Sequence, residues 1–313
     1  MKFKMVKKIR HYKNFDILKK HKNSILLIGN FDGLHKGHQK LFNLAKKYKK
    51  KKKLKIGVLT FDPLPKMFFN NNLKNFKISN NIQKLNYMKK FSLDFIITKN
   101  FNKKFSKIKC NKFISDILNK KLKAKYIFVS NNFRFGNKRE GDVNLLRKLE
   151  KKFKYKIINP KPLKINNKII SSSLIRKLIS KGKLNEANKY LSRSWSIEGV
   201  VEEGRKMGKK IGFPTCNISL GNYIIAKPGV YAVKVFIRNN LKSIKGIANL
   251  GYRPTFDQKK ILLEVNLFNF SGNLYNKKLT VEFIKFIRKE RKFNGINQLR
   301  EQIKLDLKAA KQN

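Results

Sequence analysis

The chain has 313 residues, of which 41% are hydrophobic and 12% are aromatic. This content is sufficient for packed cores and excludes a disordered tail, and the length favours two domains over one. The two cysteines, Cys110 and Cys216, show no CxxC spacing, which argues against a disulfide framework and a zinc site. Because the sequence has neither a signal-peptide core nor an apolar run of about 18 residues, we expect a soluble, cytoplasmic protein with no membrane partner.

The formal net charge of +58 is spread along the whole chain. Of the 76 basic residues, 64 are lysine and 12 are arginine, and asparagine, isoleucine and phenylalanine are also abundant. A nucleic-acid-binding face would gather basic residues and interleave them with aromatic ones. The codons of these abundant amino acids are A/T-rich, so a biased genome accounts better for the charge. We expect no nucleic-acid partner; a basic nucleic-acid-binding protein stays the alternative, marked by a steep salt dependence and no nucleotide turnover.

The first half of the chain alternates apolar, strand-like runs with helical patterns. The predicted strands are residues 25–28, 54–61, 95–98 and 126–129, and the predicted helices are residues 39–50, 82–91 and 111–122. Such alternation predicts a parallel sheet with helices on both faces and ligands at the carboxyl ends of its strands.

The turn after the first predicted strand carries three glycines and two of the four histidines. Without a Cβ atom, Gly29, Gly33 and Gly37 let the backbone approach an anion, and the start of the following helix favours phosphate. His35 and His38 are spaced i, i+3, so both imidazoles project to one side of the first helical turn. There they can donate hydrogen bonds to phosphate oxygens whose charge rises in a transition state.

Polar residues also follow later strands, at residues 62–65 and 130–136. In the second of these segments, the Asn132 amide can match the polar edge of a ring, and the Arg134 guanidinium can hold a phosphate. These segments meet at one edge of a parallel sheet, which indicates a single site.

Three serines, Ser171, Ser172 and Ser173, precede a predicted helix that contains Arg176. Hydroxyl groups and free N–H groups at a helix start suit a pyrophosphate, and the arginine can neutralise its charge. Simple capping of the helix by serine is the alternative explanation.

Beyond residues 190–194 the pattern changes to short strands. We predict them at residues 195–202, 229–237, 244–248, 261–268 and 279–286, followed by an amphipathic helix at residues 296–311. Several short strands at regular spacing predict an antiparallel barrel, here covered by one helix.

Residues 204–217 form a loop of glycines and cations that ends in Pro-Thr-Cys-Asn, which could wrap the phosphates of a nucleotide. Thr215 and Asn217 offer hard oxygen ligands that could complete a Mg²⁺ shell with ATP phosphates. Glu264 lies in a predicted strand and points opposite to its neighbours Leu263 and Val265. A carboxylate of this kind can accept the proton of a hydroxyl that is being phosphorylated.

The N-terminal motifs resemble the nucleotidyltransferase superfamily, which transfers AMP or CMP from a nucleoside triphosphate. Their order, at residues 28–38, 61–65, 132–136 with 141–142, and 171–176, is similar to that of the bacterial bifunctional riboflavin kinase/FAD synthetase family. The resemblance implies catalytic roles for His35, His38 and Arg176. It implies flavin and nucleotide binding by Gly29, Asn30, Phe31, Asp32, Gly33, Asn132, Arg134, Ser171, Ser172 and Ser173. The chain departs from the family at Leu64, Leu174 and Asn132, where a histidine, a basic residue and an acid are frequent.

The C-terminal motifs resemble the riboflavin kinase module, at residues 212–217, 228–231, 246–251, 253–256 and 263–265 and at Arg288 with Phe293. The resemblance implies that Thr215 and Asn217 hold Mg²⁺ with ATP and that Glu264 is the base on the ribityl 5′-hydroxyl. Further ligand contacts are implied for Gly204, Gly208, Gly212, Pro214 and Arg288. Cys216 replaces a common alanine.

We therefore predict an α/β plus β chain. A Rossmann-like nucleotidyltransferase domain with a parallel sheet would span residues 1–188, and a riboflavin kinase-like antiparallel β-barrel with a terminal α-helix would span residues 189–313. The expected reactions are phosphorylation of riboflavin to FMN and adenylation of FMN to FAD with release of pyrophosphate. ATP, riboflavin and FMN would be the partners and Mg²⁺ the cofactor. The alternatives are one surviving activity, or another nucleotidyltransferase acting on pantetheine phosphate or nicotinate mononucleotide. The sequence predicts no oligomeric state.

Overall fold

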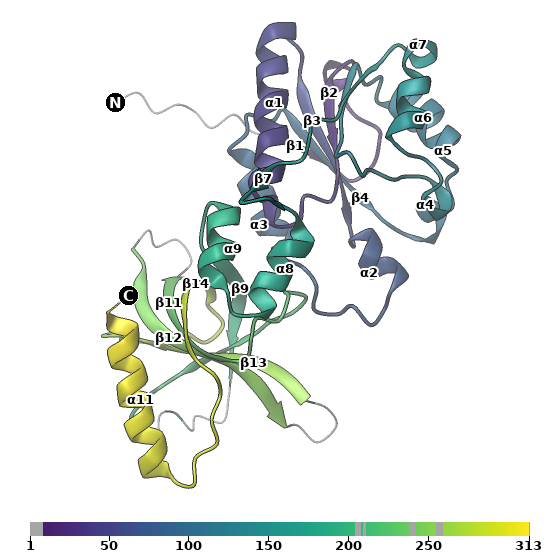
Figure 1. Cartoon of the computed structure of the whole chain (residues 1–313). Helices are drawn as coiled ribbons and strands as arrows, with labels where there is room; N and C mark the ends of the chain where they lie inside the picture. Colours follow the sequence, from purple (N-terminus) through teal and green to yellow (C-terminus); the bar gives the residue numbers. More distant parts are fainter. Residues whose placement is uncertain (1–8, 204–207, 209–210, 238–241, 255–258, 313) are drawn as a thin grey trace, which may run out of the picture. The chain divides into compact units, whose positions relative to one another are not determined.

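The structure is a computed structural model that describes residues 9–203, 208, 211–237, 242–254 and 259–312 (Figure 1). The chain divides into two compact units. The first comprises residues up to Leu73 together with Asn81–Ser171, and the second comprises Lys74–Asn80 and Ser172–Asn313. Each unit is described separately below.

The first unit is built on a six-stranded sheet in which every pairing is parallel. Its strands are β1 (Arg10–Tyr12), β2 (Ile25–Ile28), β3 (Ile56–Asp62), β4 (Phe95–Asn100), β5 (Tyr126–Phe128) and β6 (Lys156–Ile158). The order across the sheet is β1-β4-β3-β2-β5-β6. From β2 the chain adds β3 and β4 on one side of β2, and it later adds β5 and β6 on the other side, so the strand order reverses between β2 and β5. The predicted parallel sheet is confirmed, although the sequence pattern missed β1 and β6, which have three residues each.

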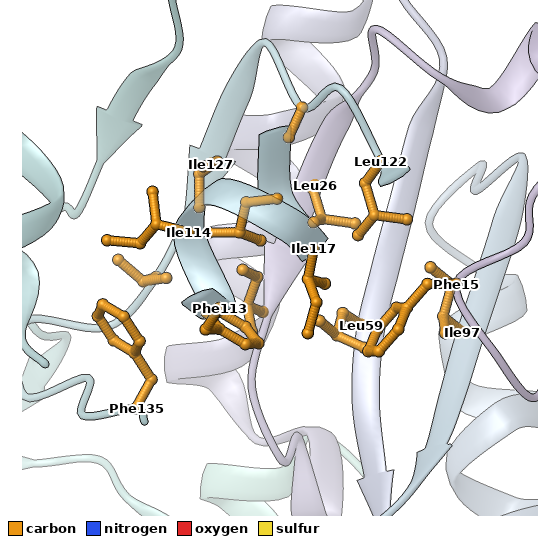
Figure 2. Packing of buried hydrophobic residues seen from close by; sticks show 14 of the residues in the cluster. Phe15, Leu26, Leu59, Ile97, Phe113, Ile114, Ile117, Leu122, Ile127 and Phe135 are labelled. Atoms are coloured by element: carbon orange, nitrogen blue, oxygen red, sulfur yellow. The ribbon is translucent and has the colours of Figure 1, made fainter. Parts of the chain in front are cut away.

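Helices cover both faces of this sheet (Figure 1). On one face α1 (Lys36–Lys52) and α3 (Asn81–Lys89) pack on a core that includes Ile25 and Leu27. On the other face a π-helical segment, η3 (Phe113–Lys121), packs with α6 (Val143–Lys148) on a core that includes Leu26. This alternation along β2 is the period of two that buries both faces of a parallel strand. Figure 2 shows Ile114 and Ile117 of η3 against Leu26, Leu59, Ile97 and Ile127 of the strands.

Short elements complete the first unit. They are η1 (Lys19–His21), η2 (Asp32–Leu34), α2 (Pro65–Phe69), α4 (Lys103–Ser106), α5 (Cys110–Lys112), η4 (Asn137–Arg139), α7 (Glu150–Phe153) and the hairpin β7 (Lys164–Ile165) with β8 (Lys168–Ile169).

The second unit contains a closed antiparallel barrel with the strand order β10-β13-β12-β11-β14-β9. The strands are β9 (Trp195–Glu202), β10 (Cys216–Ser219), β11 (Gly229–Ile237), β12 (Ile244–Pro254), β13 (Lys259–Leu267) and β14 (Lys278–Arg288). Trp195, Tyr231 and Phe283 are the largest fully buried side chains of its core, and the ring centroids of Trp195 and Phe283 are 4.8 Å apart. The predicted barrel is confirmed. One expectation was wrong: residues 216–217 are not loop but begin β10, a strand of four residues whose approach, Gly-Phe-Pro-Thr at residues 212–215, resembles a turn.

Helices α8 (Ser172–Ser180), α9 (Leu184–Leu191) and α11 (Ile296–Lys311) accompany the barrel. The terminal helix α11 packs against β11, β12 and β14, as expected for a helix that covers the barrel. Helix α9 packs on β9 and β14, where the Asn188 side chain accepts from the Trp195 backbone N–H at 2.7 Å and donates to the Phe283 carbonyl at 3.1 Å.

A short segment from the first half of the chain, residues 74–80, belongs to this second unit. Its backbone pairs with the loop before β11. The Lys77 N–H donates to the Asn222 carbonyl at 2.8 Å, and the Lys77 carbonyl accepts from the Ile224 N–H at 2.8 Å. The buried Trp195 indole donates to the Ile78 carbonyl at 2.9 Å. By packing, therefore, residues 74–80 and 172–191 accompany the barrel. The functional boundary at 188/189 stays a prediction, since compactness alone does not define where an activity ends.

Among the described residues, no helix has the length and apolar content needed to cross a membrane.

Candidate functional site

The reversal between β2 and β5 places the first candidate site within the parallel sheet. In such sheets, ligands bind at the carboxyl ends of the strands where the strand order reverses. The carboxyl end of β2 leads into the turn at residues 29–38, and that of β5 leads into residues 130–136. Two of the motifs singled out by the sequence therefore lie at adjacent positions of this edge.

The turn after β2 is held in a conformation that few sequences adopt. Phe31 and Leu34 have φ values of 49° and 40°, and Gly33 has a φ of 76°, all in the left-handed region. Phe31 and Asp32 are almost fully buried, and the Phe31 ring contacts the ring of Phe42 at 5.0 Å between centroids. Left-handed conformations at side-chain-bearing residues persist only where the surroundings fix them, and they concentrate at functional sites.

The two histidines of the turn lie together, with stacked rings whose centroids are 3.7 Å apart and whose planes are inclined by 23°. His35 caps α1, and its Nδ1 accepts from the His38 backbone N–H at 3.4 Å. In its neutral form His35 therefore carries its proton on Nε2. A Cβ on Gly37 would lie 3.0 Å from the Ile170 carbonyl oxygen, so a glycine here lets the chain that leads to Ser171 approach the histidine turn. The structure thus brings His35, His38 and the residue before Ser171 to one place.

Asn132 and Arg134 lie exposed in the loop after β5. The Ser130 hydroxyl donates to Asn132 Oδ1 at 2.9 Å. Arg134 Nη1 lies 3.3 Å from Asp142 Oδ2, and Asp142 also caps α6 by accepting from Leu145 N at 2.9 Å. An exposed pair of this kind contributes at most about 1 kcal/mol, so the guanidinium can turn to an incoming phosphate at little cost.

The serines and Arg176 divide between the two units. Ser171 is the last residue of the first unit, whereas Ser172, Ser173 and Arg176 belong to α8 in the second. Within the second unit, Arg176 Nε donates to the Phe76 carbonyl at 2.8 Å, and the guanidinium carbon lies 3.7 Å from the centroid of the Phe76 ring. The structure thus gives Arg176 a role in holding residues 74–80, and its expected role in adenylyl transfer stays a prediction.

The second candidate site lies on the outer face of the barrel. Asn217 of β10 and Asn249 of β12 are both register partners of Glu264 on β13. Directly opposed residues of antiparallel strands share a face, so the three side chains form one polar row. Leu263 and Val265 are buried, and Glu264 is partly exposed, which confirms the expected alternation along this strand. Asn249 Nδ2 donates to Glu264 Oε2 at 3.5 Å.

Thr215 and Pro214, just before β10, are exposed beside this row. Asn266 Nδ2 donates to the Pro214 carbonyl at 2.7 Å and fixes the approach to β10. A Cβ on Gly208 would lie 2.5 Å from the Phe213 carbonyl oxygen and 3.1 Å from Thr215 Oγ1, so the loop passes close to Thr215 only because residue 208 is a glycine. Gly212, with a φ of 87°, makes the turn. Gly204 lies outside the described residues.

Cys216 stands between Thr215 and Asn217 in the sequence, and its side chain lies on the opposite face of β10 from that of Asn217. Burial raises the pKa of Cys216 to about 11, so the free thiol stays protonated and is a poor nucleophile at neutral pH. This residue is a small packing group between the two expected Mg²⁺ ligands in the sequence.

Arg288 is held by an acid that the sequence pattern did not indicate. Its Nε donates to Asp306 Oδ1 at 2.7 Å and its Nη2 to Asp306 Oδ2 at 2.5 Å. Asp306 is 4% exposed and lies on α11, so this bidentate pair fastens the terminal helix to the end of β14. The expected contact of Arg288 with the flavin stays a prediction.

The sequence reasoning missed Asn249 as a site residue. Its motif at residues 246–251 had been noted, and the period of two on β12 could have placed Asn249 on the same face as Glu264. In the described part of the chain, Asn249 Oδ1 is buried and accepts no hydrogen bond. A buried amide oxygen of this kind suits a hydroxyl donor or a hard cation.

Comparison with known proteins gives two family matches. The FAD synthetase model matches residues 17–174, and the riboflavin kinase model matches residues 191–313. The bifunctional riboflavin kinase/FMN adenylyltransferase of Buchnera aphidicola subsp. Schizaphis graminum is 41% identical over 92% of this chain and 93% of its own length. The Escherichia coli K12 and Bacillus subtilis proteins with the same name are each 33% identical, and each alignment covers at least 90% of both chains.

A solved structure named as a macrolide-efflux protein from Streptococcus pneumoniae has a TM-score of 0.85 and 29% identity, covering 96% of this chain and 98% of that one. The likeness extends over both units. Two family matches in this order, and relatives above 30% identity along nearly the whole length, show that the chain belongs to the bifunctional riboflavin kinase/FMN adenylyltransferase family.

Proposed function

We propose that the barrel unit phosphorylates riboflavin with ATP to give FMN, and that the parallel-sheet unit then transfers AMP from a second ATP to FMN. The observation that carries the proposal is the pairing of two sites in one chain. The stacked histidines lie where the sheet reverses, and Glu264 lies between Asn217 and Asn249 on the barrel. Because both reactions consume ATP, we place the protein in the cytoplasm.

In the kinase reaction, Glu264 accepts the proton of the ribityl 5′-hydroxyl while that oxygen forms a bond to the γ-phosphorus of ATP. The bond between this phosphorus and ADP breaks, and ADP leaves with the electron pair. Asn249 holds the Glu264 carboxylate through its amide N–H, so the base keeps its orientation before the substrate arrives. Positioning and charge neutralisation then supply most of the rate.

The donors near Glu264 fit a magnesium ion. Thr215 and Asn217 provide a hydroxyl and an amide oxygen, and Mg²⁺ commonly combines one or two protein oxygens with water and substrate phosphates. In the described part of the chain, no three His, Cys, Asp or Glu side chains form a metal cage, so most ligands would come from ATP itself. When bound by Thr215 and Asn217, the ion would offset the charge of the phosphates.

In the adenylyl transfer, a phosphate oxygen of FMN forms the new bond to the α-phosphorus of ATP, and the bond to pyrophosphate breaks. The nucleophile is already an anion, so this step needs no strong base. His35 and His38 stabilise the charge that grows on the α-phosphate oxygens. We assign the pyrophosphate to Ser171, Ser172, Ser173 and Arg176, and the flavin and nucleotide to the turn at residues 29–33 with Asn132 and Arg134.

The test is a time course with riboflavin, ATP and Mg²⁺ in which chromatography separates the flavins. FMN that appears first and FAD that follows support both assignments. A second reaction started from FMN isolates adenylyl transfer. FMN without FAD would contradict the assignment of the first unit, and unchanged riboflavin would contradict that of the barrel.

A further inference from the structure

A buried ammonium group lies behind the turn that follows β2. Lys84 on α3 is 3% exposed, and α3 packs against η2 in that turn. One contact of its ammonium is a hydrogen bond to Thr60 Oγ1 on β3, at 3.1 Å. Lysine is almost never fully buried unless it is paired or hydrogen-bonded, because its charge loses hydration. The burial of Lys84 therefore depends on the hydrogen bonds that its ammonium makes.

The hydrogen bond from Lys84 to Thr60 fixes the direction of the hydrogen bond between Thr60 and Asn30. An ammonium has three donors and no acceptor, so Thr60 Oγ1 must accept from it. The single proton of the threonine hydroxyl is then available for the Asn30 carbonyl oxygen, which lies 3.2 Å away. Thr60 is completely buried, so water does not compete for either bond. The result is a directed chain from Lys84 through Thr60 to Asn30.

This chain sets the orientation of one peptide group in the turn. The Asn30 carbonyl and the Phe31 N–H belong to the same planar, trans peptide unit and point in opposite directions. With the carbonyl bound to β3, the Phe31 N–H is directed away from β3. The preceding residue is tied to the same strand, because Gly29 N donates to the Leu59 carbonyl at 3.1 Å. Two consecutive bonds to β3 thus hold the start of the turn.

The buried ring of Phe31 also restrains rotation of this peptide group. It is 2% exposed, and its centroid lies 5.0 Å from that of Phe42 and 5.3 Å from that of His38. Phe31 has a φ of 49°, which an unsupported phenylalanine would leave. Lys84 and Thr60 supply the polar support that complements this packing beside a catalytic histidine.

We infer that Lys84 and Thr60 are positioning residues for ATP in adenylyl transfer. By orienting the peptide group between Asn30 and Phe31, they hold the Phe31 N–H as a donor for a triphosphate oxygen. Because the bond is made with bound ATP as well as with its transition state, its loss raises the KM for ATP and leaves kcat little changed. This inference rests on the adenylyl-transfer function proposed above.

The test compares Thr60→Val with Thr60→Ser in FAD formation from FMN and ATP. Valine keeps the shape of threonine without the hydroxyl, and serine keeps the hydroxyl. We expect Thr60→Val to raise the KM for ATP about tenfold or more, the usual effect of a lost hydrogen bond to a charged group. Thr60→Ser should stay within about threefold of the wild type. Lys84→Met should resemble Thr60→Val, and Lys89→Met, a matched change at an exposed position of the same helix, should have no effect.

FMN formation from riboflavin by the same molecules is the internal control and should not change in any variant. An unchanged KM for ATP in Thr60→Val would overturn the inference, as would equal losses in Thr60→Val and Thr60→Ser. If Lys84→Met does not fold, the threonine pair decides the question. A wild-type protein that forms no FAD would overturn the proposed function together with this inference, whereas normal wild-type FAD formation with unaffected variants would overturn the inference alone.

Discussion

The bidentate pair between Arg288 and Asp306 allows a structural role to be separated from a ligand-binding one. Both side chains are largely buried, with 16% and 4% of their surfaces exposed, and the pair joins β14 to α11. Removing one partner of a buried ion pair leaves the other charge without compensation, whereas replacing both by apolar residues is often neutral. We therefore consider Arg288→Met, Asp306→Leu and the double variant.

Each single variant should lower the unfolding free energy of the barrel unit by about 3 kcal/mol, the low end of the range for buried pairs because Arg288 is slightly exposed. For a unit of this size, that corresponds to a fall in Tm of about 6–12 °C. The double variant should recover most of this loss. Trp195 is the only tryptophan of the chain and lies buried in the barrel, so its fluorescence follows this unit specifically.

The KM for riboflavin, measured below the melting transition, then tests the expected flavin contact of Arg288. If Arg288 binds the flavin, the KM rises in Arg288→Met and stays high in the double variant despite its recovered stability. If the arginine acts only by fastening α11, the KM of the double variant returns to the wild-type value as its stability recovers. Single variants as stable as the wild type would refute the argument that this pair fastens the helix.

Three further outcomes are expected. His38→Ala should abolish FAD formation from FMN and leave FMN formation intact; a parallel loss of both rates in a folded protein would contradict two separate sites. Glu264→Gln should lower the kinase kcat by about 10²–10⁴, the usual contribution of a general base, with adenylation of added FMN unchanged. Because burial raises the pKa of Cys216 to about 11, only the unfolded thiol ionises between pH 9 and 11. The wild type should therefore lose stability relative to Cys216→Ala as pH rises through that range, measured by urea unfolding; a constant difference would be inconsistent with the raised pKa.

The sequence predicted those parts of the fold that rest on a repeated pattern. The strand at residues 25–28 and the helix at residues 296–311 were predicted with their observed bounds, because an apolar run and a helical period continue through each. β5 is as short as β1 and β6, but its three residues form an apolar run, whereas β1 and β6 each begin with charged or polar residues, Arg-His in β1 and Lys in β6. The sequence analysis did not predict β10, because its four residues follow a turn-like Pro-Thr pair.

Spacing also predicted part of the candidate sites. It placed His35 and His38 on one side of a helix start, and it placed Glu264 opposite Leu263 on its strand. It gave no sign of Asp306 beside Arg288, since that contact joins a strand to a helix that begins several residues later. The contacts of residues 74–80 combine backbone hydrogen bonds of Phe76 and Lys77 with bonds from polar side chains to main-chain carbonyls, which an apolar period does not encode.

The attachment of residues 74–80 to the barrel affects how genes of this family can be recombined. A kinase fragment that starts at residue 189 would lack the carbonyl of Ile78, to which the Trp195 indole donates, and the backbone partner of Ile224. A chimaera that exchanges only the C-terminal part between two relatives would combine a foreign barrel with this native segment. In such hybrids, residues 74–80, residues 172–191 and the barrel should therefore come from the same parent protein. A single crossover point in the gene does not meet this requirement.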